Sequence, residues 1–333
     1  MSIQHNISLK EYNTFGIDVY AKQFISINSV KKLVEIINLN NDIFLIGGGS
    51  NMLLTSDIEK LVIYLNLKGI IVNDTKKDIV YVTAEAGENW NEFVLWCISQ
   101  NYGGLENLSL IPGNVGTSPI QNIGAYGVEI KDTLHQLEAL EIETGETKIF
   151  TKDECNFGYR NSIFKNELKG KYIIVNVTFK LTKNNHILNT SYGAISTYLK
   201  NKETPTIKDI SDAVIAIRQS KLPNPKEIGN SGSFFKNPVI SKIHFKTLKE
   251  NYPEIPHYII NENEIKIPAG WLIEQCGFKG KRFGDAGVHS KQALVLVNYG
   301  NATGKEILHL AKKIQQKVKK TFNIKIEIEV NII

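Results

Sequence analysis

The sequence predicts an α+β protein with more than one domain, and three observations support this prediction. The chain has 333 residues, enough for two or three domains with sizeable cores. Apolar residues recur at helical spacing in some segments and alternate with polar residues in others. Two glycine-rich loops interrupt these segments, at Gly47–Asn51 and at Pro112–Gly127.

The first region reads as a small α/β unit. Val30, Leu33, Val34 and Ile37 have the spacing of one helix face, and residues 43–46 form a short apolar run typical of a buried strand. The glycine turn comes directly after this run, and a further strand is predicted from residue 61 to residue 67.

A second region is predicted from about residue 69 to residue 184. It has strands at residues 79–84 and 137–142, and between them lies the long loop from Pro112 to Gly127. A polar excursion follows, and the next helix is predicted to start near Thr206 and to bury Ile210, Val214 and Ile217.

The third region runs to a helix that is predicted to end near Phe322. Beyond it, residues 324–330 alternate isoleucine or valine with lysine or glutamate, which predicts a last strand with one buried face. That strand would point Glu327 and Glu329 away from the buried face.

The composition is that of an ordinary soluble protein, with 42% hydrophobic and 22% charged residues. No apolar run approaches the roughly 20 residues of a membrane helix, and the first residues lack the apolar core of a signal peptide. Cys97, Cys155 and Cys276 are too scattered for a metal knuckle and too few for a disulfide framework. We therefore expect a cytoplasmic protein with reduced thiols and no metal.

The net charge of +5 comes largely from lysine. Much of it lies between Lys312 and Lys320, on the polar side of a helix whose other side carries Ile307, Ile314 and Val318. This pattern favours a solvated helix face over a nucleic-acid patch. No nucleic-acid partner and no membrane partner are expected, and the chain is expected to be a monomer.

Ser233 lies in the segment GNSGSFFKNP, with no acid or histidine beside it. A nucleophilic serine needs a neighbouring base, whereas a serine that donates a proton to a carbanion needs only its position. The segment also lacks the G-x-S-x-G elbow of hydrolases. The sequence therefore favours a proton donor over a hydrolytic nucleophile.

The two glycine loops match neither common nucleotide motif. The turn GGGSN lacks the third glycine of G-x-G-x-x-G, and no GKT or GKS follows it. Glycine turns after strands nevertheless let backbone N–H groups approach phosphate oxygens. Two such loops on adjacent α/β regions predict a grip on a pyrophosphate from both sides.

Several longer motifs, in order along nearly the whole chain, carry a resemblance to a known family. They are NTFG at residue 13, GGGSN at 47, IPGNVGTSPIQNIGAYG at 111, GYRNSIFK at 158, GNSGSFFKNP at 229, AGWLIEQCGFKG at 269 and VHSKQALVLVN at 288. Together they resemble UDP-N-acetylenolpyruvoylglucosamine reductase. The insertion with Ser191, Tyr192 and Gly193 resembles the form in which a tyrosine-bearing loop closes over the substrate.

The resemblance implies an FAD-binding domain in two parts, of the vanillyl-alcohol-oxidase type, and a C-terminal α+β substrate-binding domain. The implied boundaries are 1–68 with 323–333 for the first FAD-binding part, 69–210 for the second, and 211–322 for the substrate-binding domain. The substrate loop falls near residues 184–205.

The implied activity is that of a UDP-N-acetylmuramate dehydrogenase of peptidoglycan precursor synthesis. NADPH reduces non-covalently bound FAD and leaves, and the flavin then reduces the enolpyruvyl ether of UDP-N-acetylglucosamine to the lactyl ether. Ser233 maps to the proton donor, Arg160 to the cation at the substrate carboxylate, and Glu329 to the acid that supports the charge or relays the proton.

The same resemblance implies two sets of binding residues. For the flavin they are Gly47, Gly48, Gly49, Ser50, Asn51, Pro112, Gly113, Gly116, Thr117, Ser118, Gly124 and Gly127. For the substrate they are Tyr159, Tyr192, Lys221, Asn237 and Gln275, with Lys236 as a further candidate cation.

One departure and two alternatives remain at this stage. The family's last strand ends Glu-Val-Arg, whereas this chain has Asn331 in place of the arginine, so an ionic contact from that position is in doubt. An FAD-dependent alcohol or sugar oxidase of the same fold is one alternative, although no histidine for covalent flavin attachment lies in either glycine loop. The other is a non-catalytic nucleotide-sugar-binding protein, against which Ser233, Arg160 and Glu329 argue together.

Overall fold

The computed structural model describes residues 2–40 and 42–333, which divide into two compact units. Unit 1 comprises residues 1–7, 21–48 and 59–220, and unit 2 comprises residues 8–20, 49–58 and 221–333. In the described ranges, no helix combines the length and the apolarity needed to cross a bilayer. The three-part division expected from the sequence stays a prediction.

The first sheet of unit 1 has four strands in the order β1-β2-β5-β3. Their bounds are Gln4–Ser8 for β1, Tyr20–Ile27 for β2, Ile43–Ile46 for β3 and Ile58–Leu65 for β5. β3 pairs with β5 in parallel, and helix α1, Val30–Leu39, buries Leu33, Ile36 and Ile37. The predicted helix and both predicted strands of this region are confirmed.

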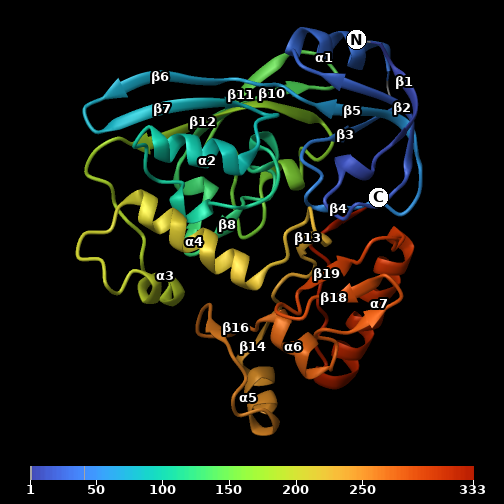
Figure 1. The fold of residues 1–333 in the computed structure, drawn as a ribbon, viewed down its shortest axis with the longest axis vertical. Coiled ribbons are helices and arrows are strands. Elements are labelled where there is room, and N and C mark those ends of the chain that lie inside the picture. Colours follow the sequence, from blue (N-terminus) through green and yellow to red (C-terminus); the bar gives the residue numbers. More distant parts are fainter. Residues whose placement is uncertain (1, 41) are drawn as a thin grey trace. The chain divides into compact units, whose positions relative to one another are not determined.

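The second sheet of unit 1 has five antiparallel strands in the order β11-β10-β12-β7-β6. Their bounds are Ile70–Lys76 for β6, Ile79–Glu85 for β7, Leu134–Glu141 for β10, Thr147–Thr151 for β11 and Tyr172–Thr182 for β12. Figure 1 shows helix α2, Trp90–Ser99, along one face of this sheet, where Trp90 and Phe93 pack with Phe179.

The long glycine loop lies in unit 1 between α2 and β10 and has little regular structure. It contains the short helix η3, Val115–Thr117, and a two-strand ribbon of β8, Gly124–Ala125, and β9, Val128–Glu129. Three further short helices of unit 1 are η2, Glu106–Leu108, η4, Ile130–Asp132, and η5, Ile163–Lys165. Apart from this ribbon, the loop therefore keeps its shape through specific contacts rather than through a ladder.

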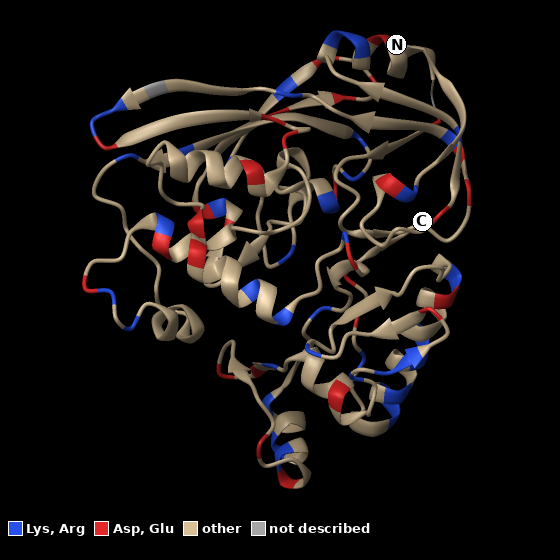
Figure 2. Ribbon diagram, viewed as in Figure 1, with Lys and Arg blue, Asp and Glu red and all other residues tan. Residues whose placement is uncertain are grey.

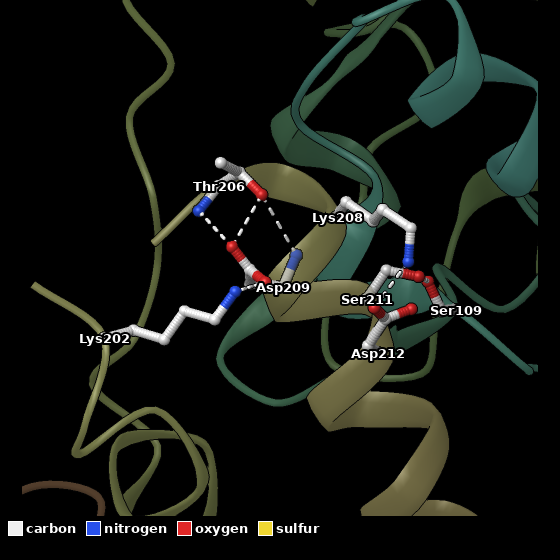
Figure 3. A network of polar contacts seen from close by, with 7 residues as sticks. All are labelled: Ser109, Lys202, Thr206, Lys208, Asp209, Ser211 and Asp212. Carbon is white, nitrogen blue, oxygen red and sulfur yellow. Dashed lines mark hydrogen bonds and ion pairs between the residues drawn. The ribbon is translucent and has the colours of Figure 1, made fainter. Parts of the chain in front are cut away.

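Helices α3, Gly193–Tyr198, and α4, Ile207–Lys221, follow β12. At the start of α4, the backbone N–H of Asp209 donates to Thr206 Oγ1 at 3.3 Å, and the backbone N–H of Thr206 donates to Asp209 Oδ2 at 3.0 Å. Figure 3 shows this cap together with an ion pair from Lys202 to Asp209. The reciprocal cap fixes the start of the helix where the sequence predicts it.

The main sheet of unit 2 has the order β13-β19-β18-β17. Its strands are Gly229–Ser233 for β13, Arg282–Phe283 for β17, Ala286–Val288 for β18 and Val295–Asn298 for β19. A smaller sheet joins β14, Val239–Ser241, β16, Glu264–Lys266, and β15, Tyr258–Ile259. The helices of this unit are η1, Lys10–Tyr12, α5, Lys242–Asn251, α6, Ala269–Gln275, and α7, Gly304–Phe322.

Helix α7 confirms the predicted helix and its end at Phe322. Ile307, Ile314 and Val318 are buried along one side, whereas the lysines from Lys312 to Lys320 lie on the exposed side. Figure 2 shows several basic residues along this helix. The lysine run is thus the polar face of an amphipathic helix.

The strand predicted at residues 324–330 is wrong as a continuous strand. Ile324, Ile326 and Val330 are buried in the predicted alternation, but only Ile328 forms a bridge, to Phe235. The partner segment ends at Pro238, which has no N–H to extend a ladder. Pairing resumes with β20, Asn331–Ile332, which is parallel to β4, Met52–Leu53.

Candidate active site

The two glycine loops meet within unit 1. A Cβ atom at Gly48 would lie 2.8 Å from both Asn114 Oδ1 and the Cα of Gly113, and one at Gly47 would lie 2.9 Å from Thr117 Cγ2. At Gly48 the close contact includes backbone, so a side chain does not fit there, whereas at Gly47 a side chain would require Thr117 to shift. The loops expected to hold one ligand therefore lie against each other, with glycine backbone at their junction.

The second loop is anchored on the end of β7. The N–H of Gly116 donates to Ala86 O at 3.0 Å, and a Cβ atom at Gly116 would lie 2.4 Å from the Cβ of Ala86. Ser118 is buried and donates its hydroxyl to Val115 O at 2.6 Å. Packing alone therefore accounts for Gly116 and Ser118, while Gly113 lies at the junction with the first loop.

The first loop is divided between the units, because Gly49, Ser50 and Asn51 belong to unit 2. Gly49 has a φ of +59°, and a Cβ atom there would lie 2.0 Å from Tyr12 O. The O atom of Asn51 accepts from the backbone N–H of Asn331 at 3.1 Å and from its Nδ2 at 2.9 Å. Asn331 thus replaces the family arginine with a neutral double hydrogen bond to the glycine loop.

Arg160 is held at the second glycine loop. Its Nη2 donates to Gly124 O at 2.7 Å, and a Cβ atom at Gly124 would lie 3.1 Å from Arg160 Nη1. The guanidinium also lies over the ring of Tyr159, 5.6 Å from its centroid. Arg160 has a φ of +53°, in the left-handed region that residues other than glycine seldom adopt.

Tyr192 contacts the same loop from the segment before α3. Its ring meets that of Tyr126 edge-to-face, with centroids 5.0 Å apart. Asn107 Nδ2 donates to Tyr126 O at 3.1 Å and to Asn189 O at 3.0 Å, which ties the glycine loop to the tyrosine-bearing segment. Asn189 in turn donates to Gly127 O at 3.2 Å. These contacts therefore hold Tyr192 beside the glycine loop, although its side chain is partly exposed.

Arg218 belongs to this cluster, and the sequence analysis missed it. Its guanidinium donates a hydrogen bond to the Tyr126 hydroxyl, while its Nε is buried and has no hydrogen-bond partner. Burial lowers the pKa of this guanidinium, and the nearby Arg160 cation lowers it further. The sequence contained one signal that could have drawn attention to Arg218. Arginine is rare in this chain, with three arginines among 39 lysine and arginine residues.

Ser233 is exposed at the end of β13 in unit 2. Gly232 precedes it with a φ of +67°, and the two phenylalanines after it are buried, with Phe234 N–H donating to Leu294 O at 2.8 Å. Among the described residues, no acid or histidine forms a hydrogen bond with the Ser233 hydroxyl. The serine is thus fixed by its neighbours and presented without a base.

Glu329 lies beside this serine motif in unit 2. Its backbone N–H donates to Phe234 O at 2.9 Å, and its side chain is half-buried. Glu327, two residues earlier, is exposed and pairs with Lys236 at 3.3 Å. The structure thereby separates the two carboxylates, and it gives Lys236 a protein partner.

The remaining candidate substrate residues lie at element ends. Lys221 is the exposed last residue of α4, and Gln275 is the exposed last residue of α6. Asn237 Oδ1 accepts from the backbone N–H of Ala269 at 2.9 Å, at the start of α6. Its amide nitrogen is therefore the part that can donate to a ligand.

The donor set suits a dinucleotide better than a metal. Within residues 2–40 and 42–333, no group of three histidine, cysteine or acidic side chains is arranged to hold a metal ion. Gly47, Gly48 and Gly113 instead place half-buried glycine backbone where the two loops meet, and glycine turns of this kind suit a pyrophosphate.

Family models and related sequences both match this chain, and they indicate the same family. A family model described as an FAD binding domain matches residues 21–151, and one described as the C-terminal domain of UDP-N-acetylenolpyruvoylglucosamine reductase matches residues 224–333. The chain is 62% identical to the reductase of that name from Flavobacterium johnsoniae and 49% identical to that from Amoebophilus asiaticus, each over the full length of both chains.

A solved structure supports the same fold. The reductase from Thermus caldophilus superposes with a TM-score of 0.70 at 24% identity, and the match covers 100% of this chain and 99% of that one. The expected α+β fold with an FAD-binding domain and a C-terminal domain is thereby confirmed.

Proposed function

The chain belongs to the UDP-N-acetylenolpyruvoylglucosamine reductase family, and from that premise we propose which of its residues carry out the reduction. It is an FAD-dependent oxidoreductase of peptidoglycan precursor synthesis that acts on a small-molecule substrate. The observation that carries the proposal is Ser233, an exposed hydroxyl without a base, next to the backbone of Glu329. Neither an oxidase nor a non-catalytic binding protein has comparable support.

The two glycine loops hold the flavin in this proposal. Gly47, Gly48 and Gly113 keep backbone within reach of its pyrophosphate, and Gly116 and Ser118 hold the second loop in place. FAD, when bound, supplies the hydride that reduces the enolpyruvyl double bond. NADPH is the co-substrate that we assign to the first half-reaction.

The chain's own residues supply the proton and the charge stabilisation. Ser233 gives its proton to the carbon beside the substrate carboxylate, where negative charge develops after hydride addition. Arg160 binds that carboxylate and so stabilises the enolate-like charge. Glu329 relays a proton back to Ser233.

Four residues bind the rest of the sugar nucleotide in our proposal. Lys221 and the amide nitrogen of Asn237 contact the diphosphate, with Gln275 as a further donor. Tyr192 closes over the substrate from the segment before α3. We also propose a monomer located in the cytoplasm, to which the three free thiols of the described chain are suited.

The experiment that tests the proposal separates the two half-reactions. Ser233→Ala should leave flavin reduction by NADPH intact and slow flavin reoxidation by substrate by roughly 1,000-fold or more, as expected when a proton donor is lost. Stopped-flow absorbance follows both steps. Ser231→Ala is the matched control, because its hydroxyl is buried against Met52 O.

Two results would contradict the proposal. Purified protein without a flavin absorption band would refute the flavin chemistry itself. Equal losses in both half-reactions of Ser233→Ala would refute the assignment of the proton donor.

A further inference from the structure

A buried asparagine in unit 1 ties the second glycine loop to the tyrosine-bearing segment. Asn107 is 1% exposed, and its Nδ2 donates to Tyr126 O at 3.1 Å and to Asn189 O at 3.0 Å. Tyr126 belongs to the glycine loop, whereas Asn189 lies three residues before Tyr192. One side chain therefore joins two segments that are far apart in the sequence.

The two acceptors explain why an asparagine is needed at this position. Both are backbone carbonyl oxygens, so the side chain that serves them must offer two N–H groups from one point, as an amide nitrogen does. An aspartate of the same shape has no donor when ionised, and a serine has only one. Without Asn107, the two carbonyls would lose a buried partner, which is costly.

The backbone of Asn107 is itself firmly held. The residue is the middle one of helix η2, between Glu106 and Leu108, and Leu108 is completely buried. The indole Nε1 of Trp90 in helix α2 donates to Leu108 O at 2.9 Å. Asn107 therefore projects from a rigid support, and a group supported in this way can fix the position of a loop.

Asn189 carries the connection toward Tyr192. Its Nδ2 donates to Gly127 O at 3.2 Å, so it contacts the glycine loop directly as well as through Asn107. Its Oδ1 accepts from the backbone N–H of Ser191 at 3.3 Å and from the Ser191 hydroxyl at 2.8 Å. The residue before Tyr192 is thus bound to one that is itself held on the glycine loop.

Helix α3 holds the chain on the other side of Tyr192. The backbone N–H of Ile195 donates to Tyr192 O at 2.8 Å. Helices α3 and α4 share a small buried core of Ile195, Leu199, Ile210, Ala213, Val214 and Ile217. The side chain of Tyr192 nevertheless remains 43% exposed. The backbone is therefore held on both sides, while the ring can still contact a ligand.

We propose that Asn107 is a positioning residue for substrate binding, which acts through Asn189 to hold Tyr192 in place. This inference rests on the proposed function, which assigns Tyr192 to the substrate. Because the segment is held before the substrate arrives, less conformational entropy is lost on binding. Removing the Asn107 side chain should therefore weaken substrate binding more than it slows the chemical step.

A double-mutant cycle with Tyr192 tests this connection in the FAD-containing protein. Asn107→Ala should raise the substrate concentration for half-maximal flavin reoxidation by about 10-fold and change the limiting rate by less than about 3-fold. In a Tyr192→Ala background, the same substitution should change the half-saturating concentration by less than about 2-fold, because the residue through which it acts is gone. Stopped-flow absorbance over a series of substrate concentrations gives both quantities.

A matched control and a second variant accompany the cycle. Asn176 Nδ2 donates to Glu138 Oε2 at 2.8 Å between strands β12 and β10, so Asn176→Ala removes an amide donor elsewhere and should leave the half-saturating concentration unchanged. If Asn107→Ala fails to fold, Asn189→Ala takes its place in the cycle, because Asn189 is only partly buried. The same non-additive result is expected for it.

Two results would overturn the inference while the proposed function stands. If Tyr192→Ala weakens substrate binding but Asn107→Ala has the same effect with and without the tyrosine, Asn107 does not act through Tyr192. A lower melting temperature of Asn107→Ala with an unchanged half-saturating concentration would make Asn107 purely structural. An unchanged half-saturating concentration in Tyr192→Ala alone would instead overturn the proposed role of Tyr192, and this inference with it.

Discussion

The two ends of helix α4 differ in how their charges are satisfied. At the start, Asp209 pairs with Lys202 and caps the helix with Thr206, and Lys208 pairs with Asp212 at 2.6 Å (Figure 3). Near the end, Arg218 donates to a tyrosine hydroxyl. One helix thus carries polar groups that have partners within the protein and one polar group, Arg218 Nε, that has none among the described residues.

Charged residues therefore have two different roles within the 15 residues of helix α4. In the pairs at the start of α4 both lysines are exposed, so each pair adds little to stability, and none needs a ligand. Near the end, the buried Nε of Arg218 has no hydrogen-bond partner among the described residues, which costs stability in the free protein. Because Lys221, a proposed substrate contact, also lies at this end, changes at the two ends should move different observables, binding and turnover at one end and unfolding at the other.

The largest effect is expected from Arg160→Met at the proposed carboxylate contact. Flavin reoxidation by substrate should slow by about 100- to 1,000-fold, because a preorganised group that stabilises developing charge is lost. Flavin reduction by NADPH should be nearly unchanged, as stopped-flow absorbance can show. A fall in melting temperature without slower flavin reoxidation would contradict this prediction, because Arg160 would then stabilise the fold instead of acting on the substrate.

A smaller effect, on stability alone, is expected from Ser109→Ala. Ser109 and the α4 residue Ser211 are buried with their hydroxyl oxygens 2.8 Å apart, and Ser109 also donates to Glu106 O. Removing this acceptor leaves the Ser211 hydroxyl unsatisfied and should cost about 1–3 kcal/mol in urea unfolding. Ser211→Ala should cost less, because the Ser109–Glu106 bond survives. An equal loss of unfolding free energy in the two variants would contradict the assignment of Ser211 as donor to Ser109 and of Ser109 as donor to Glu106 O.

The smallest effect is expected at Asp209, and it depends on pH. Hydrogen bonds from Lys202 and then from Thr206 lower the pKa of Asp209 to about 2. Because these bonds favour the charged form, their stabilisation is complete above the unfolded pKa of about 3.9 and is lost as pH falls toward 2. The melting temperature of Asp209→Asn should be slightly below that of the unmodified protein at pH 6. The gap should close between pH 4 and pH 2, and a constant gap would exclude ionisation as its cause.

Periodicity predicted the regular elements of this fold well. The apolar spacing at Ile307, Ile314 and Val318 located α7, and the turn residue Thr206 located the start of α4. It failed at residues 324–330, where alternating burial is real but the neighbouring segment is too short to form a ladder. An alternating pattern predicts which side chains are buried. Whether the segment forms a strand depends on the neighbouring segment with which it would pair.

The site was predicted in part. The glycine loops were expected to share a ligand, and Gly47 and Gly48 do lie against Asn114 and Thr117. Arg218 was missed because a helical arginine near exposed residues looks like a solvated one, and its burial depends on Tyr126, far away in sequence. The catalytic assignments of Ser233, Arg160 and Glu329 stay predictions that the half-reaction experiments can test.

The discontinuous course of unit 2 has a consequence for biosynthesis. Every segment of unit 1 precedes residue 221, whereas unit 2 combines residues 8–20 and 49–58 with residues 221–333. Phe15, which packs on Phe234, and Leu53 are almost completely buried in the finished protein. At translation rates of about 5–20 residues per second, these side chains wait on the order of 10 s for their partners after unit 1 can fold. We therefore expect these apolar side chains to lack their partners until residues 221–333 have been made.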